Sequence, residues 1–272
     1  MYQKLLITGQ MRSGTTLLCN FLNSHEYTTM YADIFHTVAG RVPDPKGWSF
    51  SNINYLADLS QTQRYYFLYS ISHGIDVLKT ANEVNYKLDV DVHSFKNVKE
   101  LYSLLLDSIA RDGDRVVGNK VTSCELNIDN LLKQTDLKVL YIHRDARDVV
   151  VSAAKKFNQP LDGYIQAWNK GIDTILGVQN PNLLCVKFED LVCREPGLKE
   201  KLDEFLDMSV NFDIEQLHAY DRQWVANSSF NDVNSPFDAS VACRWKNNPT
   251  WDVEKVYSFC KDRLAALGYD PM

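Results

Sequence analysis

Residues 2–23 read YQKLLITGQMRSGTTLLCNFLN, and the class of fold follows from this run more than from any other part of the chain. The apolar residues before Thr8 predict a buried strand over residues 2–8. Gly9 ends that strand, and an apolar stripe that includes Leu17 predicts a helix over residues 14–23. A strand, a glycine-bounded loop and a helix in this order open a βαβ unit, which indicates an α/β fold.

The loop between this strand and this helix is GQMRSGTT, residues 9–16, and it has the glycine spacing of a Walker A phosphate loop. Glycines at both ends let the backbone point its N–H groups at an anion, and the start of the helix adds a positive dipole end. Thr15 stands where the Walker lysine would be, and Arg12 is the cation of the loop. The loop therefore suits one phosphate with a group attached to it better than a triphosphate with magnesium.

The chain after residue 112 predicts regular α/β alternation. Strands are predicted at 115–118, 137–142 and 183–188, and helices at 126–133, 146–156, 162–176, 198–206 and 253–267. Because helices separate the strands, the strands should pair in parallel with right-handed crossovers. Residues 25–112 show helical patterns and no convincing strand. We expect a single domain over residues 1–272, in which residues 25–112 form a mainly helical insertion.

The composition limits the classes of partner. The chain has 29 basic and 35 acidic residues, a net charge of −6 and a sequence pI of about 5.5, so it lacks the basic footprint of a protein that binds nucleic acid. Its six cysteines include no C-x-x-C pair, which indicates a reducing compartment and no zinc motif. No apolar run resembles a signal peptide or a membrane span. If this is the whole natural chain, we expect it to be cytoplasmic, with no nucleic-acid or membrane partner.

A second polar segment follows the strand predicted at 137–142. It reads VLYIHRDARDVVVS, residues 139–152, and places Arg144 at the end of the strand and Ser152 eight residues further on. Eight residues make slightly over two helical turns, so both side chains can meet one ligand. Judged alone, Arg144 and Asp148 could instead form an ion pair at the start of a helix.

Together the two segments resemble the nucleotide-binding motifs of sulfotransferases that use 3′-phosphoadenosine 5′-phosphosulfate (PAPS). RSGTTLL, residues 12–18, looks like the 5′-phosphosulfate loop of that family, in the form found in tyrosylprotein and bacterial members. Residues 139–152 are similar to the segment that grips the 3′-phosphate. The resemblance spans about residues 4–250, although residues 35–112 match nothing in the family. It implies a P-loop-like three-layer α/β fold with a central parallel sheet flanked by helices and a helical insertion after the first βα unit.

Three shorter stretches resemble the family more loosely. GNKVT, residues 118–122, departs from the family segment G-[DN]-K-[TD]-P at Val121 and Thr122. KFEDL, residues 187–191, has phenylalanine where tyrosine is common. RWK, residues 244–246, resembles the basic segment with tryptophan that closes over the 3′-phosphate.

The resemblance implies a sulfotransferase that moves the sulfuryl group of PAPS to a hydroxyl or amine of a small-molecule, glycan or peptide acceptor. The nucleotide product is adenosine 3′,5′-bisphosphate, and no metal is implied. Acceptor recognition is expected within residues 25–112. The expected nucleotide-binding residues are Arg12, Ser13, Gly14, Thr15, Thr16, Leu17, Arg144, Ser152, Arg244, Trp245 and Lys246.

Catalytic roles fall on fewer residues. Arg12 is expected to stabilise charge on the leaving 5′-phosphate, and Lys120 to contact the sulfuryl oxygens or the leaving oxygen. Tyrosylprotein-like relatives carry a carboxylate base 21 residues past the loop arginine, and counting on from Arg12 leads to Asp33. His36 and His93 stay open as alternatives, because histidine is poised to exchange protons near neutral pH.

Two other functions stay open. The first is a P-loop kinase or nucleotide hydrolase with a degenerate loop, against which the missing Walker lysine and the lack of an evident Walker B aspartate both argue. The second is a non-catalytic regulator that binds the nucleotide and transfers nothing. The sequence identifies neither the acceptor nor the oligomeric state.

Overall fold

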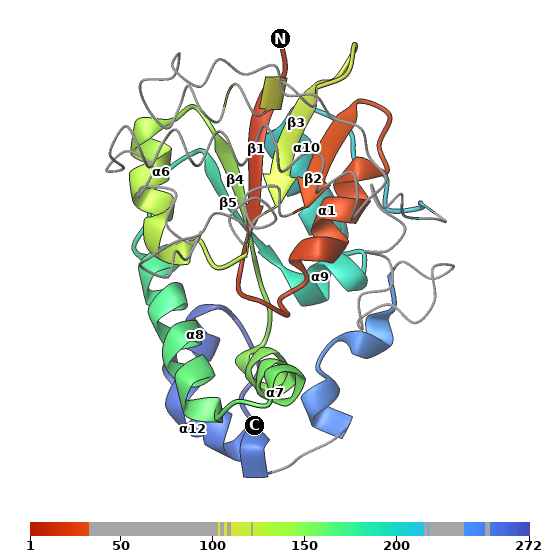
Figure 1. Cartoon of the computed structure of the whole chain (residues 1–272). Coiled ribbons are helices and arrows are strands. Elements are labelled where there is room, and N and C mark those ends of the chain that lie inside the picture. Colours follow the sequence, from red (N-terminus) through yellow and green to blue (C-terminus); the bar gives the residue numbers. More distant parts are fainter. Residues whose placement is uncertain are drawn as a thin grey trace.

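The computed structural model describes residues 1–32, 103, 106–107, 110–120, 122–214, 217, 237–247 and 251–272. Within them one parallel sheet has the strand order β2-β3-β1-β4-β5 (Figure 1). Its strands are β1 (Gln3–Thr8), β2 (Thr28–Ala32), β3 (Val116–Lys120), β4 (Lys138–His143) and β5 (Leu183–Lys187). The predicted α/β class with a central parallel sheet is confirmed.

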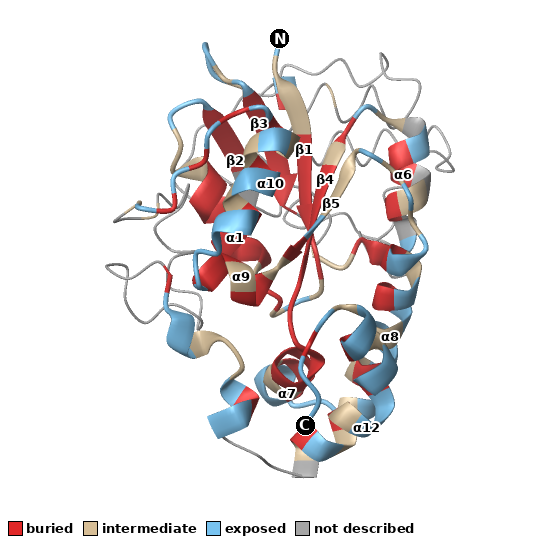
Figure 2. Cartoon of the chain, turned by 180° about the vertical axis from the view of Figure 1, so that it is seen from behind, coloured by how far each residue is buried: buried red, intermediate tan, exposed pale blue. Residues whose placement is uncertain are grey.

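Helices connect the strands and cover both faces of the sheet. The α-helices are α1 (Thr15–Asn23), α6 (Ile128–Gln134), α7 (Ala146–Phe157), α8 (Leu161–Leu176), α9 (Phe188–Val192), α10 (Pro196–Leu206) and α12 (Trp251–Ala266). Short 3-10 turns are η1 (Glu125–Asn127), η2 (Ala239–Val241) and η3 (Arg244–Asn247). Helices α1, α9 and α10 pack on one face, and α6, α7, α8 and α12 pack with the other (Figures 1 and 2).

The strands bury side chains on both faces, because successive residues of a strand point to opposite sides. Leu5 and Ile7 of β1 pack with Leu18 of α1 in one core. Leu6 of β1 packs with Trp168 of α8 in the other core. All five side chains are almost fully buried, which explains why the apolar runs of the sequence mark the strands so clearly.

The expectation that residues 25–112 contain no strand is wrong at one place, since Thr28–Ala32 forms β2 beside β3. This strand begins with two threonines, so it lacks an apolar run such as those of β1 and β4. Thr28 and Thr29 are nevertheless fully buried. Most of the remaining segment lies outside the described residues, and the helical insertion stays a prediction.

The carboxyl ends of the strands meet at one edge of the sheet. The register pairs Ile7 and Ala32 with Lys120, and it pairs His143 with Lys187. The loop after β1 and the turn after β4 therefore leave neighbouring strands at this edge, and α7 lies just beyond it (Figure 1). No described helix combines the length and the apolar character needed to cross a bilayer.

Candidate functional site

The loop after β1 is a tight turn that leads the chain into α1. The backbone N–H and the hydroxyl of Ser13 both donate to the carbonyl of Gln10, at 3.1 and 2.6 Å. Arg12 adopts a φ of 76°, a left-handed backbone that is uncommon for a residue with a side chain and often occurs at binding sites. Gly14 has a φ of 101° and caps α1. The loop thus places the N-terminal end of α1, which favours anions, at the carboxyl edge of the sheet.

The side chain of Arg12 crosses from this loop to α7. Its Nε donates to the hydroxyl of Ser152 at 3.2 Å. Partial burial and the nearby charge of Arg144 lower the pKa of the Arg12 guanidinium, which nevertheless stays charged. Two guanidinium groups that repel each other in a partly desolvated place favour an anion between them.

Arg144 follows β4 directly and is largely buried. Its Nη2 donates to Asp148 Oδ2 at 3.2 Å and to the carbonyl of Val241 at 2.7 Å. The ring of Phe188 lies against the guanidinium, with 4.4 Å between the arginine Cζ and the ring centroid. The ion pair that the sequence left open for Arg144 and Asp148 is therefore present.

The Nε of Arg144 takes no part in these hydrogen bonds. Its Nε is buried and has no hydrogen-bond partner in the part of the chain that the structure describes. An unsatisfied buried donor costs about 1–3 kcal/mol, and charged groups cost more, so a ligand that accepts this hydrogen bond would be stabilised. A phosphate oxygen fits this donor, because guanidinium groups bind phosphates with charge-assisted hydrogen bonds.

Phe188, the phenylalanine of the KFEDL segment, connects the two basic elements. A Cβ on Gly14 would lie 2.4 Å from the Phe188 ring, so glycine is needed there both for its backbone angle and for space. The same ring covers Arg144. The sequence predicts Phe188 as the last residue of a strand over residues 183–188, and this is wrong. β5 ends at Lys187, and Phe188 begins α9.

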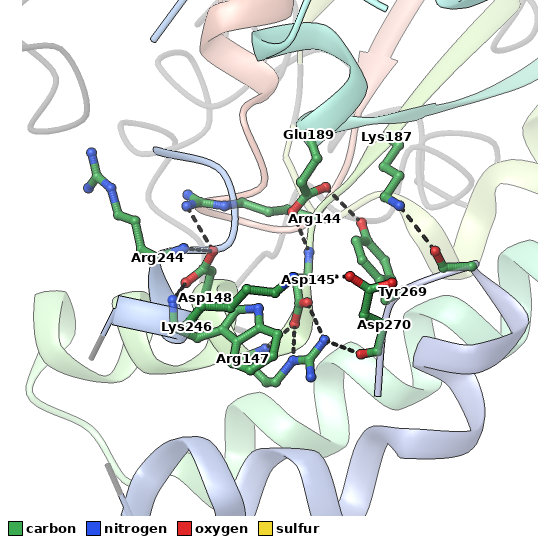
Figure 3. Close-up of polar contacts among 12 residues, drawn as sticks. Arg144, Asp145, Arg147, Asp148, Lys187, Glu189, Arg244, Lys246, Tyr269 and Asp270 are labelled. Carbon is green, nitrogen blue, oxygen red and sulfur yellow. Dashed lines mark hydrogen bonds and ion pairs between the residues drawn. The ribbon is translucent and has the colours of Figure 1, made fainter. Parts of the chain in front are cut away.

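A buried polar network stabilises the turn after β4 (Figure 3). Glu189 Oε1 accepts from the backbone N–H of Asp145 at 3.2 Å, and its Oε2 accepts from the hydroxyl of Tyr269 at 3.1 Å. The same hydroxyl lies 2.9 Å from His143 Nδ1. Burial raises the pKa of Glu189 to about 7 and lowers the pKa of His143 to about 4. The network fixes the residues on both sides of Arg144.

Arg147 and Asp145 form a fully buried ion pair at the start of α7 (Figure 3). Arg147 donates from Nε to Asp145 Oδ1 at 2.9 Å and from Nη2 to Oδ2 at 2.6 Å. Asp145 also caps α7 by accepting from the backbone N–H of Arg147. The guanidinium of Arg147 stacks on the ring of Trp245 at 3.6 Å. This pair is part of the framework of the site, and it joins α7 to the segment that contains Trp245.

The RWK segment lies against the start of α7 and contacts it through the backbone as well as through the ring of Trp245. The N–H groups of Arg244 and Trp245 donate to Asp148 at 3.1 and 2.9 Å. Trp245 is buried, and Lys246 pairs with Asp270 at 3.0 Å on the surface. The structure therefore brings this segment to Arg144 through Asp148, a residue for which the sequence motif suggested only an ion pair.

The other sequence candidates divide into two groups. Lys120 is buried at the end of β3, at the same edge as the loop. Ser13 and the first residues of α1 are buried too: Thr15, Thr16 and Leu17. The three candidates for the base, Asp33, His36 and His93, lie outside the described residues.

The sequence also missed Glu125, whose Oε1 has no hydrogen-bond partner in the described regions and whose pKa burial raises to about 7. A glutamate at the start of a helix gave no signal of this burial.

The chain belongs to the sulfotransferase family, whose model matches residues 4–212. None of the curated proteins matches it. Within the described residues no three His, Cys, Asp or Glu side chains are grouped so that they could hold a metal ion.

Solved structures share its fold. The sulfotransferase domain of the curacin biosynthetic pathway is 15% identical, with a TM-score of 0.55, and the match covers 100% of this chain and 99% of that one. The sulfotransferase domain of the olefin synthase of Synechococcus PCC 7002 is 15% identical, with a TM-score of 0.57 and coverages of 100% and 96%. A sulfotransferase from Mycobacterium avium is 14% identical, with a TM-score of 0.50 and coverages of 99% and 78%. At these identities the likeness concerns the fold.

Proposed function

We propose that this chain transfers the sulfuryl group of PAPS to a hydroxyl or amine of an acceptor and releases adenosine 3′,5′-bisphosphate. One observation carries the proposal: the phosphate loop after β1 and the buried, partly unsatisfied Arg144 after β4 lie at the same edge of the sheet. A bisphosphate nucleotide has one phosphate for each of these two basic elements. Membership of the sulfotransferase family supports the same chemistry.

The 5′-phosphosulfate is assigned to the loop and to the start of α1. Backbone N–H groups at the N-terminus of α1, the hydroxyl groups of Thr15 and Thr16 and the guanidinium of Arg12 are the available donors. As the sulfuryl group departs, negative charge grows on the 5′-phosphate. Fixed donors aimed at that charge lower the barrier more than mobile solvent does.

The 3′-phosphate is assigned to Arg144. Its Nε, which has no partner among the described residues, is a donor that an oxygen of this phosphate can satisfy, and Phe188 and Val241 hold the guanidinium in place. Ser152 contacts Arg12, whose guanidinium is close enough to Arg144 to interact with its charge. In this proposal the segment with Arg244, Trp245 and Lys246 covers this end of the nucleotide.

Proton removal from the acceptor is assigned to Asp33, with His36 and His93 as the alternatives. β2 ends at Ala32, which pairs with Lys120 at the carboxyl edge of the sheet, and Asp33 is the next residue of the sequence. This order supports a carboxylate near the reacting group, with Lys120 on the neighbouring strand. Residues 25–112 would recognise the acceptor, which we propose to be a small molecule or a glycan in the cytoplasm.

The direct test is calorimetry with adenosine 3′,5′-bisphosphate, followed by an acceptor screen with labelled PAPS. We expect one nucleotide to bind per chain without added metal and label to move to an acceptor. Absence of heat and of a thermal shift would overturn the proposal. Hydrolysis of ATP that requires magnesium would favour a kinase or hydrolase, and binding without transfer to any acceptor would favour a regulator.

A further inference from the structure

We propose that Asp148 is a positioning residue that couples the 3′-phosphate arginine, Arg144, to the segment of residues 237–247. The inference rests on the proposed function, because it concerns how the same nucleotide site is held together. The hydrogen bonds of Asp148 join it to Arg144, Arg244 and Trp245, at the end of the site assigned to the 3′-phosphate. Its role is to fix Arg144 and the backbone of the segment relative to each other.

The carboxylate of Asp148 accepts three hydrogen bonds from two different parts of the chain. Oδ2 accepts from Arg144 Nη2 at 3.2 Å and from the N–H of Arg244 at 3.1 Å. Oδ1 accepts from the N–H of Trp245 at 2.9 Å. Arg244 and Trp245 begin η3, so Asp148 satisfies two N–H groups that a helix leaves without an internal partner.

Arg144 holds the same segment from the other direction. Its Nη2 donates to the carbonyl of Val241, which ends η2. The ion pair between Arg144 and Asp148 is almost completely buried, with side-chain exposures of 11% and 6%. Arg144 and Asp148, at the start of α7, therefore bind one carbonyl and two N–H groups in the segment of residues 237–247. This arrangement fixes the guanidinium and leaves its Nε available to a ligand.

The geometry predicts what an isosteric change would do. Asparagine at position 148 keeps the shape of the side chain but has only one oxygen and carries an NH₂ group, which donates. If its oxygen faces Arg144 and Arg244, its NH₂ group faces the N–H of Trp245. If it is turned over, the NH₂ group faces Arg144 and the N–H of Arg244. In either orientation a donor faces a donor, and one side of the coupling is lost.

The coupling should act on the 3′-phosphate and not on the rest of the nucleotide. Arg144 must stay in place to receive this phosphate, and an ordered segment beside it excludes water and strengthens the charge interaction. The carboxylate also repels a bound phosphate, but three donors already compensate its charge. We therefore expect the loss of positioning to outweigh the relief of repulsion.

The experiment compares Asp148→Asn with Asp173→Asn. Asp173 is a matched control, because it also pairs with an arginine, Arg263, at 2.6 Å, but between α8 and α12. The affinities of both variants and of the wild type are measured for adenosine 3′,5′-bisphosphate and for adenosine 5′-monophosphate, which lacks the 3′-phosphate. We expect Asp148→Asn to weaken the bisphosphate at least about tenfold and the monophosphate less than about threefold, and the control to change neither.

Hydrogen exchange of the wild type gives a second measurement that does not depend on any variant. The bisphosphate should slow exchange at the N–H groups of Arg244 and Trp245, and the monophosphate should not. Equal responses to the two nucleotides, or an Asp148→Asn protein that keeps its preference for the bisphosphate, would overturn the coupling. If the wild type binds no bisphosphate at all, the proposed function fails first and the inference fails with it.

Discussion

The Nε of Arg12 donates a hydrogen bond to the hydroxyl of Ser152 at 3.2 Å, across 140 positions of sequence. This contact joins the loop after β1 to the middle of α7, so the structure brings the two segments of the candidate site together. Partial burial lowers the pKa of Arg12, and Arg144 is close enough for its charge to lower that pKa further. Repulsion between the two guanidinium groups is relieved when an anion binds there, and substitution of either arginine should therefore have large effects.

Arg12→Ala should lower turnover with PAPS at least about a hundredfold, because a donor aimed at developing negative charge is typically worth about 10² to 10³ in rate. The measurement is transfer of labelled sulfuryl groups at saturating donor. Met11→Ala is the matched control, since Met11 is the neighbouring loop residue and is partly exposed. A loss of only a few fold in Arg12→Ala would show that the loop does not stabilise the leaving group.

Arg144→Ala should raise the KM for PAPS at least about tenfold and leave the use of adenosine 5′-phosphosulfate, which has no 3′-phosphate, nearly unchanged. Steady-state kinetics with the two donors measures the difference. Arg263→Ala removes an arginine that pairs with Asp173 elsewhere and serves as the control. Equal losses with both donors would contradict the assignment of Arg144 to the 3′-phosphate.

The parts of this site that sequence predicted are those encoded locally. The loop from Gly9 to Thr16 is a continuous motif between an apolar strand and an apolar helix, and both elements form as expected. Arg144 follows a strand whose apolar run is equally clear. Such patterns are readable because burial on both faces of the sheet requires them.

The parts that sequence could not predict depend on contacts between distant segments. Asp148 binds the N–H groups of Arg244 and Trp245, nearly a hundred positions away, and no local pattern signals this. Tyr269 reaches Glu189 and His143 in the same way. β2 was missed because its burial comes from its place beside β3 and not from an apolar run of its own.

Gly14→Ala should lower both stability and affinity for the nucleotide. The backbone angle of Gly14, 101°, is strained for alanine, and the added Cβ would lie 2.4 Å from the Phe188 ring. Together these effects should lower the free energy of unfolding by at least about 1–3 kcal/mol. Urea unfolding measures the change. The double variant Gly14→Ala, Phe188→Ala relieves the contact with the ring but not the strain of the backbone angle, and it therefore separates the two effects. Wild-type stability of the single variant Gly14→Ala would refute both.

Glu189 should make stability depend on pH near neutrality. Its pKa is about 7 in the folded protein, above the ordinary value of 4.5. Between these values the folded state binds more protons than the unfolded state, so the stabilising contribution is complete below pH 4.5 and is lost as pH rises through about 7. The change from pH 5 to pH 8 is about 2–3 kcal/mol of unfolding free energy.

Glu189→Gln removes this titration and keeps the network, because glutamine resembles the protonated carboxyl group. Its oxygen can accept from the N–H of Asp145, and its NH₂ group can donate to Tyr269, whose hydroxyl then donates to the neutral His143. The free energy of unfolding of Glu189→Gln minus that of the wild type should therefore rise by about 2–3 kcal/mol between pH 5 and pH 8. Contributions from Glu125 and His143 are present in both proteins and cancel in this difference. The control Glu200→Gln, which changes an exposed side chain of α10, should show no such rise. If the difference in unfolding free energy between Glu189→Gln and the wild type stayed constant from pH 5 to pH 8, Glu189 would not titrate in this range.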